Sequence, residues 1–272
     1  MDPVTQTRVG RTSSPRRRGL VLSNWEGSFA TVHIVLTGGK FLTGYALALG
    51  ATAFHIGVLN AIPFFFQGVQ LVSAYLTNRL GRRKPLTLIT SLMAREFWIV
   101  MIVLTFLPGL SATQKIYIFL AVYFLACISG ILTANAWILW MGDLIPTAIR
   151  GRYLARRNLI LVLVALLVDQ VGSQFFEWTK QRGDPWLGHR VILSVAVVCA
   201  AVAGWFLWRQ HEPKWHRTEA PPPVQFLREV WANANFKRVL KFFAVWNFGV
   251  GLSAAFFSVH MLTVLNMSYP TI

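Results

Sequence analysis

The sequence predicts an all-α, polytopic membrane protein, with six transmembrane helices in one bundle and a seventh helix after them. Two observations lead to this prediction. The 272 residues are 55% hydrophobic and only 13% charged, with 11 Trp and 20 Phe, a balance that excludes water-soluble globular domains and disordered chains alike. Seven apolar stretches are also long enough to cross a hydrocarbon core about 30 Å thick as helices.

The seven spans are expected near residues 27–49, 53–76, 86–107, 116–141, 159–176, 191–208 and 242–265. Helices are the expected form, because strands of a membrane barrel would show about 10 residues of alternating pattern. The N-terminal tail and the links after spans 2, 4 and 6 hold 20 Lys and Arg residues, whereas the other links hold four. Because Lys and Arg accumulate in cytoplasmic loops, the N-terminus is expected on the cytoplasmic side of a cytoplasmic, or inner, membrane. The formal charge of +16 follows from this topology, so no nucleic-acid partner is expected.

Four parts are expected along the chain. Residues 1–26 form a basic cytoplasmic tail, 27–208 a six-helix transmembrane bundle, 209–241 a cytoplasmic linker, and 242–272 the first transmembrane helix of an incomplete second bundle. The linker contains a Pro run that breaks helices, so its first part is either a hinge between two halves or a plain solvated connection. Its second part has the apolar and basic spacing of an interfacial helix.

An internal repeat supports the division into halves. An offset of 216 residues aligns TGGKF at 37–41 with SAAFF at 253–257. Small residues recur where helices approach one another closely. Span 7 is therefore expected to repeat span 1, and the chain ends where the repeat predicts the start of an eighth span.

The link between spans 2 and 3 is a specific motif, LTNRLGRRKPL at 76–86. Gly81 allows a sharp backbone reversal, and Pro85 suits the first turn of the next helix. The link resembles the signature of the major facilitator superfamily between transmembrane helices 2 and 3, which is Gly-x-Leu-Ala-Asp-Arg-x-Gly-Arg-Lys. Ala74 and Asn78 stand where the pattern has its first Gly and its Asp. The residues that match the pattern are Leu76, Arg79, Gly81, Arg82 and the basic Arg83.

The link between spans 4 and 5, WMGDLIPTAIRGRYLARRN at 140–158, also resembles the superfamily, in which a carboxylate closing span 4 and an Arg-Gly-Arg turn are common. Asp143 is expected within reach of Arg82 or Arg83. Such a charge pair would either latch the cytoplasmic face shut in one state or be a surface salt bridge worth about 0–1 kcal/mol. The expected cytoplasmic gate comprises Asn78, Arg79, Gly81, Arg82, Arg83, Asp143, Arg150 and Arg152.

The resemblance implies both a fold and a function. The fold would be the N-terminal half, plus the first helix of the second half, of a 12-helix major facilitator superfamily transporter. The function would be secondary active transport of a small solute by alternating access, coupled to an ion or proton gradient. The implied partners are a small-molecule substrate, H⁺ or Na⁺, the lipid bilayer, and a missing C-terminal half that activity would need.

Four formal charges lie inside the predicted spans, namely Lys40, Arg95, Glu96 and Asp169. By helical rise all four are expected near the midplane, where an unpaired charge costs at least about 2.5–3.5 kcal/mol. Lys40 and Asp169 are expected to face one cavity and to form a charge pair. This pair either takes part in function or only neutralises two buried charges. Arg95 and Glu96 are expected to form a structural pair.

Polar residues at helical spacing on spans 1, 2, 4 and 5 predict polar stripes, and the resemblance implies that these spans line a central cavity. His33 is expected to be a packed or capped histidine and not a proton carrier. The expected cavity residues are Lys40, Asp169, His33, Thr37, Asn60, Gln67, Asn135, Gln170, Ser173 and Asn247.

Motifs of other function classes are absent from the sequence. There is no His/Asp metal-ligand spacing, nucleophile elbow, phosphate-binding loop or dinucleotide fingerprint, so neither an enzyme nor a cofactor or metal site is expected. Cys127 and Cys199 lie in apolar spans and are expected to pack there as free thiols. The alternative to a transporter is a membrane-embedded enzyme or receptor. Such a protein would convert or bind its ligand without moving it across the membrane.

Overall fold

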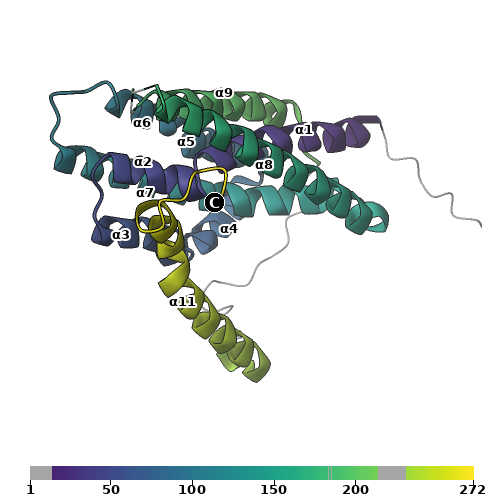
Figure 1. Ribbon diagram of the computed structural model, residues 1–272. Coiled ribbons are helices and arrows are strands. Elements are labelled where there is room, and N and C mark those ends of the chain that lie inside the picture. Colours follow the sequence, from purple (N-terminus) through teal and green to yellow (C-terminus); the bar gives the residue numbers. More distant parts are fainter. Residues whose placement is uncertain (1–13, 183, 185, 214–230) are drawn as a thin grey trace, which may run out of the picture.

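The computed structural model describes residues 14–182, 184, 186–213 and 231–272 (Figure 1). Throughout that part of the chain, helices are the only regular secondary structure. Five helical segments there are long and apolar enough to cross a membrane, namely Lys84–Leu104, Ala112–Leu144, Thr147–Lys180, Leu187–Arg209 and Ala234–Thr263. The prediction of an all-α membrane protein is confirmed at this level.

The helices are α1 (Ser14–Leu36), α2 (Gly39–Ala48), α3 (Ala53–Phe65), α4 (Val69–Leu80), α5 (Lys84–Glu96), α6 (Trp98–Leu104), α7 (Ala112–Leu144), the 3₁₀ turn η1 (Thr147–Ile149), α8 (Arg150–Lys180), α9 (Leu187–Arg209) and α11 (Ala234–Thr263). Seven apolar spans were expected, and three of them are divided between two helices each: the first between α1 and α2, the second between α3 and α4, and the third between α5 and α6, which are separated only by Phe97.

The first predicted span, 27–49, is interrupted. α1 ends at Leu36 and α2 begins at Gly39, whose φ of +48° lies in the left-handed region. Glycine adopts this conformation without the strain that a Cβ would cause. The prediction of one continuous helix over 27–49 is therefore wrong, and the adjacent Gly38 and Gly39 explain why.

The second predicted span, 53–76, is also interrupted, because α3 ends at Phe65 and α4 begins at Val69. Pro63, in the last turn of α3, has no N–H to donate to the preceding turn, and Gly68 precedes α4. The two helices have 13 and 12 residues. At about 1.5 Å per residue neither covers a hydrocarbon core of about 30 Å alone.

The helix boundaries differ from the predicted parts at both ends of the chain. α1 begins at Ser14, so Arg16, Arg17 and Arg18 lie on a helix that continues into the bundle. α11 begins inside the predicted linker, where the Asn233 side chain accepts hydrogen bonds from the N–H groups of Asn235 and Phe236 at 3.0 and 3.1 Å. Residues 1–13 of the predicted tail and 214–230 of the predicted linker lie outside the described residues.

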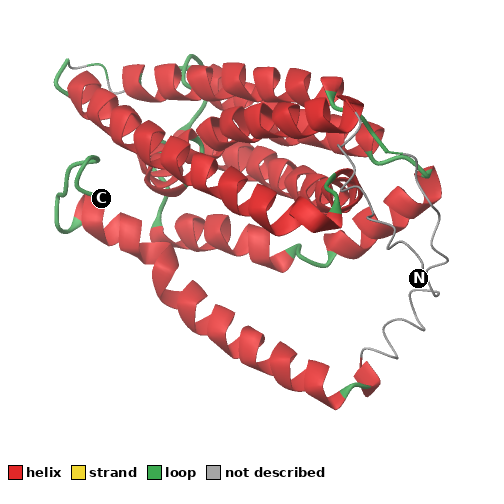
Figure 2. Ribbon diagram, turned by 90° about the vertical axis from the view of Figure 1, so that its right-hand side faces the viewer, coloured by secondary structure: helices red, strands yellow, loops and turns green. Residues whose placement is uncertain are grey.

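The long helices lie alongside one another, with α1 packed on α8 and α9, and α5 packed on α7 and α9. α3 and α4 pack on α7. Helix α11 diverges from this bundle and touches it at α2 and α3 (Figure 2). It is followed by a short segment, 264–272, that turns back toward the bundle.

Buried apolar residues gather at both ends of the bundle. One end of the bundle is the end at which α4 meets α5 and α9 ends, and we call it the Arg83 end. The buried cluster there includes Leu20, Trp140 and Leu144. At the opposite end the buried cluster comprises Tyr45, Ala46, Leu49, Ile56, Leu59, Trp98, Met101, Leu104, Ile116, Phe119 and Leu193. The candidate site residues lie between and beside these two clusters.

Candidate functional site

Lys40 lies directly after the interruption between α1 and α2. Its side chain is only 7% exposed, and its Nζ donates to Asp169 Oδ2 at 2.9 Å and to the Tyr269 carbonyl at 2.8 Å. The Asp169 side chain, from α8, is 43% exposed. The expected ion pair is therefore formed, with its cation enclosed and its carboxylate open on one side.

The segment after α11 covers Lys40. The Tyr269 ring lies 5.9 Å from the Phe41 ring and 4.3 Å from the Phe176 ring, centroid to centroid. Its hydroxyl fills the space beside Gly44, where an added Cβ would come within 1.8 Å of the Tyr269 oxygen. Burial, with a smaller contribution from the Glu177 carboxylate, raises the pKa of Tyr269 to about 12. The phenol therefore stays neutral beside the ion pair.

A second polar site lies at the interruption between α3 and α4. Asn135 Nδ2 donates to the Gln70 carbonyl at 3.0 Å, Gln70 Nε2 donates to Gln67 Oε1 at 2.5 Å, and Gln67 Nε2 donates to the Pro63 carbonyl at 3.1 Å. These side chains satisfy backbone carbonyls near the break. A pocket of about 270 Å³ lies beside them and is also lined by Cys127. The structure thus brings together the predicted residues Gln67 and Asn135.

The other predicted cavity residues do not join these two sites in one cavity. His33 packs on α9, with its Nδ1 3.2 Å from the Ala196 carbonyl, which is the packed-histidine alternative. Gln170 is exposed. The remaining four bond a carbonyl of the preceding helical turn: Thr37 that of His33, Asn60 that of Ile56, Ser173 that of Asp169, and Asn247 that of Phe243.

The predicted gate residues lie at the Arg83 end. Gly81 ends α4 with a φ of +63°, and the turn directs the Arg83 side chain toward α7. There Arg83 Nη2 donates to Asp143 Oδ2, and Nη1 donates to the Leu139 carbonyl at 3.0 Å. Of the two arginines expected near Asp143, Arg83 is thus the one that binds it, while Arg82 is exposed.

The other predicted gate residues contribute less to this contact. Arg150 Nη2 donates to the Gly142 carbonyl at 2.6 Å, which ties the start of α8 to the end of α7. Arg79 and Arg152 are exposed. The side chain of Asn78 lies outside the described part of the structure.

Glu212 contacts the predicted gate residue Arg83, although the sequence did not predict a role for it. Its Oε1 accepts from the backbone N–H of Arg83 at 2.5 Å and from that of Lys84 at 3.1 Å. These N–H groups open α5, so the carboxylate caps that helix and interacts favourably with its dipole. Because Glu212 lies in the predicted linker, no periodic pattern marked it.

A buried ionic cluster joins three helices. Glu26 Oε1 lies 3.1 Å from Arg95 Nη2, and Glu26 Oε2 lies 3.7 Å from Arg157 Nη2. The Arg157 guanidinium also lies 4.7 Å from the centre of the Trp137 ring. The predicted pair of Arg95 with Glu96 is therefore wrong, because neighbours on a helix point in different directions.

The charges inside the bundle lie at two levels. Glu26 and Lys40 are 14 positions apart along α1 and α2, a separation of about 20 Å at 1.5 Å per residue. The Glu26 cluster and the Lys40 pair therefore cannot share one depth, and the prediction of a single midplane layer of charge is wrong. Glu26 was overlooked because it directly precedes the predicted first span.

Comparison of the chain with known protein families, with characterised proteins and with solved structures finds no match. Among the described residues, no group of His, Cys, Asp and Glu is arranged to hold a metal ion. The polar groups that meet in the candidate sites are ion pairs and side-chain amides.

Proposed function

We propose that the protein is a secondary active transporter that moves a small solute across a cytoplasmic membrane by alternating access, with its N-terminus in the cytoplasm. Its helix order would be that of the N-terminal part of a major facilitator superfamily transporter. The expected solute is one that an ammonium or a carboxylate group can recognise.

The observation that carries this proposal is the Lys40–Asp169 pair beside the interruption between α1 and α2. Charged groups inside membrane helices are costly, and they mark solute or ion pathways more often than they serve structure alone. Interrupted helices are likewise typical of solute and ion sites in secondary transporters, because irregular backbone is tolerated where it lines a cavity. Such interruptions lie at residues 37–38 and 66–68 of the described chain, each with polar side chains beside it.

The unequal exposure of the pair suggests how it would work. Asp169, open on one side, could take up a proton or a cation, and either would weaken its hold on Lys40. Lys40 would then be available to a solute anion. At the Arg83 end, the Arg83–Asp143 pair would close the cytoplasmic side in one state and separate in the other.

Transport in proteoliposomes tests this proposal. Labelled small organic anions, cations and zwitterions are offered to the reconstituted protein, with and without an imposed H⁺ or Na⁺ gradient. We expect saturable uptake of at least one compound that follows the gradient, is lost in Lys40→Met and is kept in Lys115→Met. Conversion of a compound by the detergent-solubilised protein, without any gradient-dependent flux, would instead favour an embedded enzyme.

A further inference from the structure

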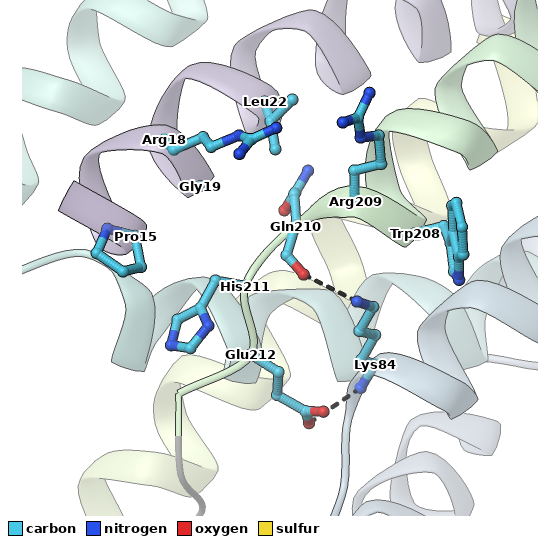
Figure 3. Close-up of a pocket in the computed structure, with 10 residues that line it drawn as sticks. All are labelled: Pro15, Arg18, Gly19, Leu22, Lys84, Trp208, Arg209, Gln210, His211 and Glu212. Atoms are coloured by element: carbon cyan, nitrogen blue, oxygen red, sulfur yellow. Dashed lines mark hydrogen bonds between the residues drawn. The ribbon is translucent and has the colours of Figure 1, made fainter.

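A pocket of about 610 Å³ opens at the Arg83 end of the bundle (Figure 3). The first turns of α1, the start of α5 and the end of α9 enclose it, and residues 210–212 form one wall. Arg18, Lys84 and Arg209 bring three cations to this pocket, and Glu212 brings one carboxylate. It is separate from the Lys40 site and from the pocket beside Gln67.

The single carboxylate is already engaged. Glu212 Oε1 accepts from the backbone N–H groups of Arg83 and Lys84 at the start of α5. The Lys84 ammonium donates to the Gln210 carbonyl at 3.0 Å, which leaves its charge uncompensated. Within the described part of the chain, neither Arg18 nor Arg209 forms a salt bridge, and the pocket carries an excess of positive charge.

The Gln210 side chain lies between these two arginines (Figure 3). It is only 1% exposed, yet neither its Nε2 nor its Oε1 has a hydrogen-bond partner among the described residues. A buried amide without partners is destabilising. Its position between two guanidinium groups therefore points to a ligand with oxygen acceptors.

Exposed aromatic residues place the pocket at a membrane surface. Trp205 and Trp208, on the last turns of α9, are 47% and 58% exposed, and Trp208 also lines the pocket. Exposed Trp residues gather at the boundary between the hydrocarbon core and water, where their rings lie at the level of the lipid headgroups. In a bundle that spans a bilayer, this position corresponds to the depth of the lipid phosphate groups.

We propose that this pocket binds the phosphate group of an anionic phospholipid. The Arg18 and Arg209 guanidinium groups would bind phosphate oxygens, as charge-assisted pairs do, and Gln210 Nε2 would donate to a third oxygen. Basic pockets between membrane helices commonly bind anionic headgroups. Inorganic phosphate offers the same oxygens, so the experiment separates the two sources.

The test uses the purified full chain in nanodiscs of phosphatidylcholine with increasing fractions of phosphatidylglycerol, and in pure phosphatidylcholine with added inorganic phosphate. The measured quantity is the thermal unfolding midpoint as a function of the phosphatidylglycerol fraction or the phosphate concentration. Arg18→Gln and Arg209→Gln should each require about tenfold more ligand for the same shift, the factor that one charge-assisted hydrogen bond corresponds to. Arg17→Gln is the matched control, because Arg17 is an exposed arginine on the same turn that does not line the pocket.

A shift with phosphatidylglycerol that the pocket variants weaken, and Arg17→Gln does not, supports a lipid site. The same pattern with inorganic phosphate, but not with phosphatidylglycerol, would show that the pocket binds free phosphate and not a lipid headgroup. An equal response of all variants would mean general attraction of a basic surface to anions, and no shift with either ligand would mean no site. Either of these last results overturns the proposal.

Gln210→Leu keeps the proposal testable if an arginine variant does not fold. Leucine has a similar volume and removes the two amide atoms that lack partners, so the variant should be at least as stable as the parent in phosphatidylcholine alone. Its response to phosphatidylglycerol should nevertheless be weaker. A stable variant with an undiminished response would exclude a role for Gln210 in the pocket.

Discussion

Arg95 is joined to Glu26 on another helix, and not to Glu96, its neighbour in the chain. Arg95 Nη2 lies 3.1 Å from one carboxylate oxygen of Glu26, and Arg157 Nη2 lies 3.7 Å from the other. A carboxylate that is 5% exposed therefore faces two guanidinium groups. Glu26 links α1, α5 and α8 at one point inside the bundle.

Glu26→Gln should destabilise the protein strongly, because it leaves two largely buried guanidinium groups without their anion. We expect a loss of about 3–5 kcal/mol in the free energy of unfolding, the range for removing one partner of a buried pair. Denaturant-induced unfolding in detergent micelles measures this loss. Glu177→Gln is the control, since the side chains of its pair with Lys180 are partly exposed, at 32% and 49%, and the pair should contribute about 0–1 kcal/mol. Equal losses in the two variants would rule out the proposed importance of Glu26.

The sequence predicted the Lys40–Asp169 pair for a clear physical reason. Few charges lie within the apolar spans, helical rise sets their depth, and opposite signs at equal depth have few other partners. The same reasoning failed for Arg95, because Glu26 lies one residue before the predicted span. An error of one residue in a boundary thus removed the true partner from consideration.

The helix interruptions were predictable in principle from local chemistry. Gly38 and Gly39 are adjacent inside an apolar span, and Pro63 precedes Gly68 by five positions in the next. Both patterns oppose a continuous helix. The contacts of Glu212 and Tyr269 were not predictable, because each depends on chain segments that meet only after the bundle packs.

Asp143→Asn should increase the access of reagents to the pocket beside α4 and α7. The change removes the carboxylate that Arg83 binds, and Arg83 connects the α4–α5 turn to α7. Cys127 lines that pocket, so its reaction with a membrane-impermeant maleimide in inside-out vesicles reports opening at the Arg83 end. We expect labelling up to about fivefold faster, the change in population that corresponds to about 1 kcal/mol.

Cys199 supplies the control for this experiment within the same molecule. It is a free thiol on α9, which packs mainly on α1 and α5. Its labelling rate should not respond to Asp143→Asn. If neither thiol changes, the Arg83–Asp143 pair is an ordinary surface salt bridge and not a gate.

Gly44→Ala should displace the segment that covers Lys40. The new Cβ would lie 1.8 Å from the Tyr269 hydroxyl oxygen, and overpacking of this kind costs about 1–3 kcal/mol. Tyr269→Phe in the same chain should recover part of the loss, because the nearest remaining ring atom would be 3.0 Å away. Thermal unfolding and proteolysis of residues 264–272 measure the two effects.

Gly57→Ala is the matched control for this substitution. Gly57 lies in α3 and has no atom within 4 Å of the position that its Cβ would take. Alanine also favours the helix over glycine there, by roughly 0.5–1 kcal/mol. If Gly44→Ala is as stable as Gly57→Ala, Tyr269 does not occupy the space beside Gly44.

Neutralising both members of the Lys40–Asp169 pair separates a functional pair from a static one. Asp169→Asn alone leaves the enclosed ammonium of Lys40 with neutral acceptors only, among them the Tyr269 carbonyl, and should lower the free energy of unfolding by about 1–3 kcal/mol. Lys40→Met together with Asp169→Asn should restore that stability in either case, because no uncompensated charge stays inside the bundle. Transport should nevertheless be lost, since neither a solute anion nor a proton would find its group. Gradient-driven uptake by the well-folded double variant at the rate of the parent protein would show that the pair only neutralises two buried charges.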